Sequence, residues 1–309
     1  MNSRIVVIGS CLTATVAFCR RMPVGGETVV ADRIYESLGG KGLDMAIQAA
    51  RLGASVVFIG VVGDDAAGSV WEAALRDAGV RTDYLVRLPG KRTGHGVILR
   101  EEDGSNVIAV DPRATRAFSP EVIDAAGDVF DTRTVVLTQL EIPLQTALHG
   151  CRMAHRFGAT TILNPAPAQD LRNQSLSCVD FLTPNETEAP VCVGAASDGG
   201  LSDHRQSAEQ MLVAGCRAVI VTRGSDGSVL YRKATPPVSV PAFAVEAVDT
   251  TGSGDSYNAS LAVALSDGTP IERAMREASA ASALSCTREG TVTAYPDRPA
   301  VSRFLGKSS

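Results

Sequence analysis

The sequence predicts an α/β protein in which helices cover both faces of a mostly parallel sheet, with a smaller sheet at one edge. Short β-branched runs alternate with amphipathic helical patterns, as where residues 56–62 precede a helix over about 66–78 that stops at Gly79. This alternation favours parallel strands joined by crossover helices, so that the sheet becomes the middle of three layers. Two regions, around residues 27–35 and 94–110, have strand patterns with no helix inside them and predict the smaller sheet.

The remaining elements of the main layer share the same two patterns. We expect strands at 5–8, 134–138, 160–163, 179–182 and 218–221, and helices over about 43–52, 144–157, 254–266 and 271–286. No linker or internal repeat divides the chain, so residues 1–309 are expected to form a single domain.

The smaller sheet is expected to form a lid. Residues 96–100 and 106–110 flank a glycine-containing connection at 102–105, which predicts a hairpin. We expect lid strands within about 11–36 and 93–111, and such a cover can exclude water from a reaction. On pattern alone, a hairpin that only completes the main sheet is equally compatible.

Composition narrows the class of protein. The 309 residues carry a net charge of -5 without a basic stripe, which argues against a nucleic-acid partner. No apolar run approaches the roughly 18 residues that span a bilayer, so no membrane partner is expected. The seven cysteines are scattered and never form a C-x-x-C pair, which favours free thiols and a cytoplasmic location.

The segment 249–255 carries the strongest chemical signal. Gly252, Ser253 and Gly254 leave their backbone amides unobstructed before a predicted helix, where the exposed N–H groups and the helix dipole favour an anion. Asp255 beside this nest can accept a hydroxyl proton while the amides stabilise charge on a phosphoryl group. Taken alone, a tight turn with Asp255 as an ordinary first-turn acid is equally compatible.

Further candidates follow other predicted strands or open other predicted helices. Gly40 and Lys41 lie in a glycine-rich turn that is not a Walker A loop, and Asp44 follows in the next helix. Asp44 fits either a ligand hydroxyl or a favourable first-turn position, and the second is the more common. Asn185 and Glu188 can orient magnesium through oxygen ligands or simply begin a helix. Residues 222–227 form either a ligand loop or a hairpin turn.

These motifs, in this order, resemble the ribokinase (PfkB) family of carbohydrate kinases across nearly the whole chain. The resemblance rests on residues 39–42, 60–65, 164–168, 185–188, 222–224 and 249–255. It implies an α/β sandwich with a β lid, and transfer of a phosphoryl group from ATP, with magnesium, to a hydroxyl of a small sugar or polyol. It further implies that the lid builds a homodimer.

The resemblance assigns roles by position. Asp255 matches the base, and Gly252, Ser253 and Gly254 match the anion hole. The sugar-side residues are Gly40, Lys41, Asp44, Glu141 and Asp255; the nucleotide-side residues are Asn185, Thr222, Gly224, Ser225 and Gly227. Asn185 and Glu188 match the magnesium-organising motif, whereas Asp249 and the carbonyl of Thr251 match a monovalent-cation site that would take potassium.

The chain departs from the pattern of ribose-specific members on the sugar side. Those members carry Gly-Ser-x-Asn-x-Asp after the first strand, where this chain has Leu12 and Ala14 in place of the two polar residues. Asp44 replaces an asparagine and, when ionised, accepts but cannot donate a hydrogen bond. We therefore expect an acceptor other than plain ribose. Ala294 replaces a hydroxyl near the cation site, which makes potassium activation less secure.

Two alternatives stay open at this stage. A nucleoside kinase of the same fold would use the same phosphoryl-transfer residues. A non-catalytic ligand-binding protein could retain the fold, although the joint presence of Asp255, Asn185 and Glu188 argues against it. A nicotinamide-dependent oxidoreductase would need a G-x-G-x-x-G turn after the first strand, and the sequence has none there.

Overall fold

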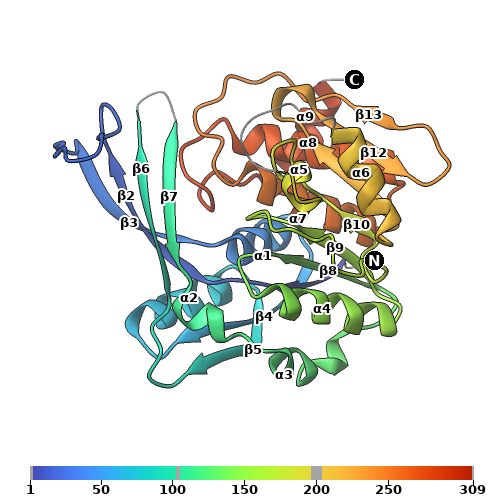
Figure 1. The fold of residues 1–309 in the computed structure, drawn as a ribbon, viewed down its shortest axis with the longest axis horizontal. Coiled ribbons are helices and arrows are strands. Elements are labelled where there is room, and N and C mark those ends of the chain that lie inside the picture. Colours follow the sequence, from blue (N-terminus) through green and yellow to red (C-terminus); the bar gives the residue numbers. More distant parts are fainter. Residues whose placement is uncertain (1–2, 102–104, 196–203, 308–309) are drawn as a thin grey trace.

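A nine-stranded sheet forms the centre of the protein (Figure 1). The computed structural model describes residues 3–101, 105–195 and 204–307. The strand order is β13-β12-β11-β10-β9-β8-β1-β4-β5, and every pair from β11 to β5 is parallel. The strands β12 and β13 add an antiparallel edge. The predicted α/β architecture is confirmed.

The strands and helices have the following bounds. The strands are β1 (Arg4–Ile8), β2 (Leu12–Phe18), β3 (Arg33–Gly39), β4 (Ser55–Gly63), β5 (Arg81–Leu88), β6 (Gly94–Arg100), β7 (Asn106–Asp111), β8 (Thr134–Gln139), β9 (Thr160–Asn164), β10 (Phe181–Leu182), β11 (Ala218–Thr222), β12 (Ser228–Arg232) and β13 (Val238–Val240). The helices are α1 (Lys41–Arg51), α2 (Ala66–Asp77), α3 (Pro120–Asp124), α4 (Leu144–Arg156), α5 (Glu188–Cys192), α6 (His204–Val213), α7 (Ser253–Ser266), α8 (Ile271–Ser285) and α9 (Arg298–Lys307). Short 3-10 turns occupy Arg113–Ala117, Gly127–Val129 and Gly224–Asp226.

Alternate residues of the central strands enter two separate cores, which confirms the three layers. Ile5 and Val7 of β1 pack with α1, α2, α7 and α8, whereas Val6 and Ile8 pack with α3, α4 and α6. Successive side chains of a strand point to opposite faces, so both faces of a central strand must be apolar to be covered by helices. The carboxyl ends of the parallel strands are therefore left to carry the polar groups.

The smaller sheet projects from the body beside these strand ends (Figure 1). Its order is β3-β2-β6-β7, with β2 and β6 parallel and the outer pairs antiparallel. Only residues 9–11 separate β1 from β2, so this lid grows directly from the carboxyl end of a central strand. The indole Nε1 of the buried Trp71 in α2 donates to the Leu12 carbonyl at 2.9 Å and fixes the base of the lid.

Three details differ from the sequence-based expectation. The strand expected around 27–35 begins only at Arg33, because the Glu27 N–H donates to the Val24 carbonyl in a turn at Gly26, where φ is 85°. Helix α1 begins at Lys41 rather than 43. The strand expected at 179–182 shortens to Phe181–Leu182. Part of the hairpin connection predicted at 102–105 lies outside the described residues.

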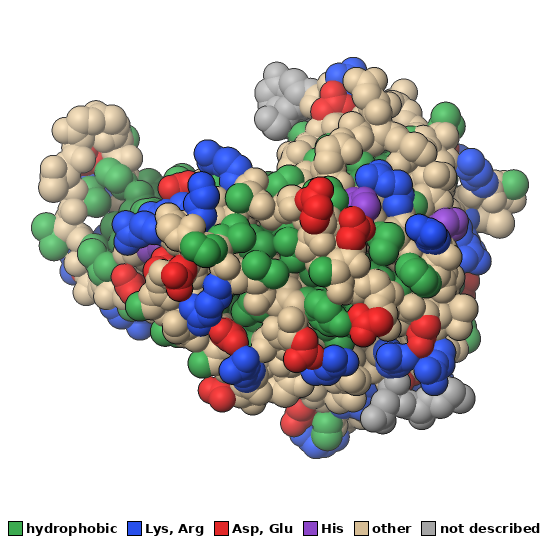
Figure 2. Space-filling view, turned by 90° about the horizontal axis from the view of Figure 1, so that it is seen from below, with side chains coloured by type: hydrophobic (Ala, Val, Ile, Leu, Met, Phe, Trp, Pro, Cys, Tyr) green, Lys and Arg blue, Asp and Glu red, His purple; other side chains and the backbone are tan. Residues whose placement is uncertain are grey.

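The face seen from below carries positive and negative side chains interspersed with apolar ones (Figure 2). This mixed pattern agrees with the small net charge of -5. Among the helices of the described residues, none is long and apolar enough to cross a membrane.

Candidate active site

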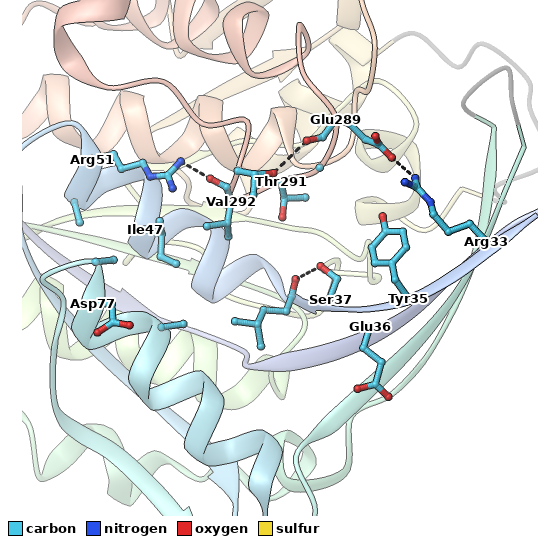
Figure 3. Close-up of a pocket in the computed structure, with 16 residues that line it drawn as sticks. Arg33, Tyr35, Glu36, Ser37, Ile47, Arg51, Asp77, Glu289, Thr291 and Val292 are labelled. Carbon is cyan, nitrogen blue, oxygen red and sulfur yellow. Dashed lines mark hydrogen bonds and ion pairs between the residues drawn. The ribbon is translucent and has the colours of Figure 1, made fainter.

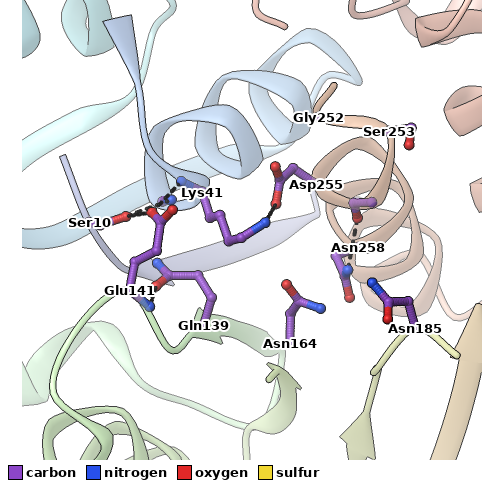
Figure 4. Close-up of polar contacts among 12 residues, drawn as sticks. Ser10, Lys41, Gln139, Glu141, Asn164, Asn185, Gly252, Ser253, Asp255 and Asn258 are labelled. Carbon is purple, nitrogen blue, oxygen red and sulfur yellow. Dashed lines mark hydrogen bonds and ion pairs between the residues drawn. The ribbon is translucent and has the colours of Figure 1, made fainter. Parts of the chain in front are cut away.

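The predicted site residues converge where the parallel strands end and helices α1 and α7 begin (Figure 4). Gln139 and Asn164 end the neighbouring strands β8 and β9, and Ser10 follows β1. Open α/β sheets bind ligands at this edge, because loops and helix N-termini gather there. The topology thus brings together polar groups from five distant parts of the chain.

A buried ion pair marks the centre of the site. The Lys41 Nζ lies 3.7 Å from Oδ1 of Asp255, whose side chain is only 7% exposed. Burial raises the pKa of Asp255 to about 6, and it does so against the opposing attraction of Lys41. Asp255 in turn raises the pKa of Lys41, so this ammonium stays charged. Oδ1 of Asp255 accepts no hydrogen bond among the described residues and is available to a hydroxyl proton.

Glu141 anchors the start of α1. Its Oε2 accepts the Lys41 backbone N–H at 2.8 Å and the hydroxyl of Ser10. A carboxylate at a helix N-terminus satisfies an otherwise unpaired amide and interacts favourably with the helix dipole. Gly40, at φ 106°, allows the sharp entry into the helix. These contacts explain why α1 begins two residues earlier than expected and hold Lys41 in place.

Asp44 behaves differently from the sequence-based expectation. Burial, followed by the negative charge of Asp255, raises the pKa of Asp44 well above its ordinary value. A neutral carboxyl group keeps one O–H donor, whereas an ionised one has none. When protonated, the side chain can therefore donate one hydrogen bond, as the asparagine of the family pattern does. Its Oδ1 is buried without a hydrogen-bond partner in the described residues and is available to a ligand.

The predicted anion nest opens helix α7. Gly252 is the N-cap at φ 74°, a left-handed conformation that favours glycine, and a Cβ there would lie 2.5 Å from the Tyr295 hydroxyl oxygen. The Gly252 and Gly254 amides make no hydrogen bond within the described residues, whereas the Ser253 N–H donates to the Thr250 carbonyl at 3.2 Å. Two of the three expected amides are therefore free to bind an anion.

Asn185 and Glu188 form a reciprocal cap at the start of α5. Oδ1 of Asn185 accepts the Glu188 N–H at 2.7 Å, while Oε2 of Glu188 accepts the Asn185 N–H at 2.9 Å. Burial raises the pKa of Glu188, against the lowering effect of the Asn185 N–H and of Lys41. Among the described residues, no hydrogen bond is made to Oε1 of Glu188, so an oxygen ligand for the waters of a magnesium ion is present. The chemistry of the donor set fits that ion.

The predicted nucleotide loop lies against this cap. Thr222 ends β11 and forms a parallel bridge with Asn185, and its carbonyl accepts the Glu186 N–H at 3.0 Å. Residues 224–227, including Ser225, then turn the chain into β12, with Gly227 at φ 84°. The segment is therefore a hairpin turn that begins beside Asn185, and its role as a nucleotide loop stays a prediction.

Asp249, expected to help hold a monovalent cation, is paired with an arginine of the lid. Arg100 donates to Oδ2 of Asp249 at 2.6 Å, and the Gly290 N–H donates to the same oxygen at 3.0 Å. The Thr251 N–H donates to Oδ1 at 3.0 Å. Burial alone would raise the pKa of Asp249, but these hydrogen bonds bring it below its ordinary value.

Sequence reasoning missed several polar residues of the site. Oδ1 of Asn258 accepts a hydrogen bond from the Thr183 hydroxyl at 2.6 Å, and its Nδ2 donates to the Gly254 carbonyl at 2.8 Å. Asn258 therefore connects α7 to the end of β10. The amide of Asn164 donates to the Thr183 carbonyl at 2.9 Å. A residue with a side-chain amide three positions after Asp255, in a helix of mostly small and apolar residues, was the available signal for Asn258. Nothing in the sequence pattern points from Arg100 to Asp249.

A separate cleft of about 970 Å³ lies between β3, α1, α2 and the segment 289–293 (Figure 3). None of the site residues predicted from the sequence lines it. The chemical groups described above, rather than the size of this cleft, therefore locate the candidate active site.

Comparison with known proteins agrees with this geometry. The model of the pfkB family of carbohydrate kinases matches residues 2–298. The ribokinase of Bacillus subtilis is 36% identical over 301 residues, which cover 97% of this chain and 99% of that protein. The deoxyribokinase of Salmonella typhi is 34% identical over 303 residues, covering 97% and 98%.

Solved structures show the same architecture. The ribokinase of Thermotoga maritima has a TM-score of 0.85 at 32% identity, covering 98% of this chain and 99% of that one. The Arabidopsis thaliana ribokinase complexed with ribose and ATP has a TM-score of 0.85 at 31% identity, covering 99% of each chain. The chain belongs to the pfkB family of carbohydrate kinases, which transfer a phosphoryl group to an alcohol. It is a carbohydrate kinase of that family.

The Lys41–Asp255 pair predicts a pH dependence. If Asp255 must be ionised to act, kcat/KM should rise with pH, reach half of its maximum near the pKa of about 6, and level off at higher pH. Lys41→Met removes a charge that favours the ionised carboxyl, so this limb should move to higher pH. Steady-state kinetics across pH would measure both midpoints; an unmoved limb in the variant would contradict the pairing.

Proposed function

We propose that this kinase transfers the γ-phosphoryl group of ATP to a hydroxyl of a small sugar or sugar-like acceptor, with Asp255 as the base. The observation that carries the proposal is the buried Asp255 carboxyl, whose Oδ1 faces the Lys41 ammonium but accepts no hydrogen bond among the described residues, and which stands at the N-terminus of α7 next to two free amides. A proton acceptor and an anion site therefore lie on adjacent residues, as phosphoryl transfer requires.

The reaction can be written with these groups. Asp255 takes the proton of the acceptor hydroxyl as the hydroxyl oxygen bonds to the γ-phosphorus. The bond between that phosphorus and the bridging β–γ oxygen breaks, and ADP carries away the electron pair. The amides of Gly252 and Gly254 stabilise charge on the transferring group, since fixed donors require little reorganisation. Lys41 keeps Asp255 ionised near neutral pH and adds positive charge beside the phosphoryl group.

The nucleotide side is assigned by the same reasoning. Thr222, Gly224, Ser225 and Gly227 form the loop that would hold ATP, beside the cap formed by Asn185 and Glu188. Magnesium, when bound with the nucleotide, neutralises phosphate oxygens. Asn185 and Glu188 would orient its waters through the open oxygen of the carboxylate.

The acceptor is proposed from the first residues of the lid. Leu12 and Ala14 are buried and apolar on the strand that follows β1, where ribose-specific members carry two polar side chains. A sugar hydroxyl opposite them would lose its partners, which costs about 1–3 kcal/mol per unmatched group. Asp44 and Glu141 still offer polar contacts. We therefore propose an acceptor with fewer hydroxyl groups than ribose, of which a deoxypentose is the simplest example.

The lid also supports the proposed homodimer. Ile34, Val97 and Val107 lie on one face of it and are exposed by 65%, 47% and 58%. Apolar side chains grouped on one small sheet are typical of a surface that a partner covers. A dimer formed through the lid thus stays our prediction for the assembly.

Replacement of the base tests the catalytic assignment. Asp255→Asn should lower kcat by about 10²–10⁴-fold, because the amide cannot accept the proton. The melting temperature should not fall, since the change removes a buried carboxyl group whose pKa is raised. Release of ADP with 2-deoxyribose, ribose and nucleosides as acceptors would be measured for both proteins. Wild-type turnover by the variant would exclude Asp255 as the base.

Restoring the polar pattern tests the acceptor. The double variant Leu12→Asn and Ala14→Asp should increase kcat/KM for ribose relative to 2-deoxyribose by about tenfold, as expected for recovered hydrogen bonds. Thr13→Asn is the matched control, because neighbouring residues of a strand point to opposite faces, and it should leave the ratio unchanged. A wild-type preference for ribose would contradict the proposed acceptor.

A further inference from the structure

The lid supplies a positive charge to the turn that precedes the anion nest. Arg100 is the last residue of β6, and its guanidinium Nη1 lies 2.6 Å from Oδ2 of Asp249. The two side chains are 11% and 3% exposed, so the pair is buried. The ring of Phe18, the residue paired with Arg100 on β2, lies 5.3 Å from its guanidinium carbon and restricts the approach of water.

Asp249 connects Arg100 to the backbone just before the nest. Its Oδ1 accepts the Thr251 N–H, and Thr251 directly precedes Gly252, the N-cap of α7. The Asp249 N–H donates to the Cys286 carbonyl at 3.2 Å, so the turn is held from both sides. Asp249 thus links Arg100 of the lid to the turn that carries the amides of the nest.

The arrangement fits a monovalent cation poorly. Oδ2 of Asp249 already has two donors, Arg100 and Gly290, and a metal ion beside it would face the guanidinium at close range. Ala294, which stands where the family pattern has a hydroxyl, is buried and adds no oxygen ligand from its side chain. The positive charge that such an ion would contribute is present as an arginine.

We propose that Arg100 is a built-in cation that replaces the monovalent metal ion at Asp249, so that this kinase works without potassium. Arg100 is a positioning residue: it acts on the anion nest through Asp249 and touches neither substrate. The inference rests on the proposed phosphoryl-transfer site. We infer in addition that the amides of the nest reach their working positions only when the lid lies against the body, because Arg100 belongs to a lid strand.

A neighbouring ion pair provides a control. Arg33 of β3 donates to Glu289 at 2.6 Å, also between lid and body, and its guanidinium lies 4.4 Å from the centre of the same Phe18 ring. It makes no contact with Asp249 among the described residues, and it is 53% exposed. Arg33→Ala therefore removes a lid contact of the same kind without removing the charge at Asp249.

The test compares wild type, Arg100→Ala, Arg100→Lys and Arg33→Ala in equal concentrations of KCl and choline chloride. ATP-dependent turnover with 2-deoxyribose and ribose, and the melting temperature without substrate, would be measured in each salt. Wild type and Arg33→Ala should differ little between the salts. Arg100→Ala in choline chloride should lose about tenfold or more in kcat, as expected for a residue that orients a reactive group. KCl should restore much of this loss and raise its melting temperature.

The possible outcomes distinguish failure of the proposed role of Arg100 from failure of the proposed kinase function. Activation of the wild type by KCl, by about tenfold, would overturn it. Equal losses for Arg100→Ala in both salts, with no effect of KCl on melting, would also overturn it and leave Arg100 a simple tether of the lid. Arg100→Lys, which keeps a cation at the position, should stay insensitive to KCl even if the alanine variant does not fold. If no acceptor is phosphorylated, the proposed function fails, whereas the melting temperatures still test the replacement.

Discussion

A buried ammonium group among carboxyl groups is the interaction on which the rest of the site depends. Lys41 lies 3.7 Å from Asp255, and both Glu141 and Asp44 contribute to the field that raises its pKa. Without this charge the carboxyl groups would repel one another in a medium of low dielectric constant, and more of them would take up protons. Lys41 lowers the pKa of Asp255, which burial still raises to about 6, whereas burial and the charge of Asp255 raise the pKa of Asp44 well above its ordinary value. Two carboxyl groups in one pocket thus acquire different roles from their surroundings.

Residues from several parts of the fold hold the Lys41 ammonium in place. Glu141 follows β8, Ser10 follows β1, and together they fix the first amide of α1, from which the Lys41 side chain reaches Asp255 on α7. Parallel strands with both faces buried leave only their carboxyl ends for such groups. The lid, which continues from β1, then covers the same edge and adds the charge of Arg100.

Periodicity and glycine placement were sufficient to predict six of the nine strands of the main sheet, five of the helices and the two regions that form the lid, because burial on both faces imposes a clear pattern. The strands β5, β12 and β13, at the two ends of the main sheet, were not predicted. The position of Gly252, Ser253 and Gly254 before a helix, with Asp255 in its first turn, was also predictable, since small residues ahead of a helical pattern place backbone amides at a helix N-terminus. Contacts between distant segments were not. The pairing of Arg100 with Asp249 joins residues 149 positions apart, and no local pattern records it. The raised pKa of Asp44 likewise depends on burial and on Asp255, which only the assembled site supplies.

The central claim, that Asp255 is a buried base with a raised pKa, can be tested without substrate. Carbon-13 NMR of protein labelled at the aspartate carboxyl carbons, with Asp255→Asn to assign the resonance, would follow its titration directly. The structure predicts a midpoint at about 6. A resonance of Asp255 that titrates near the ordinary value of 3.8 would contradict the account.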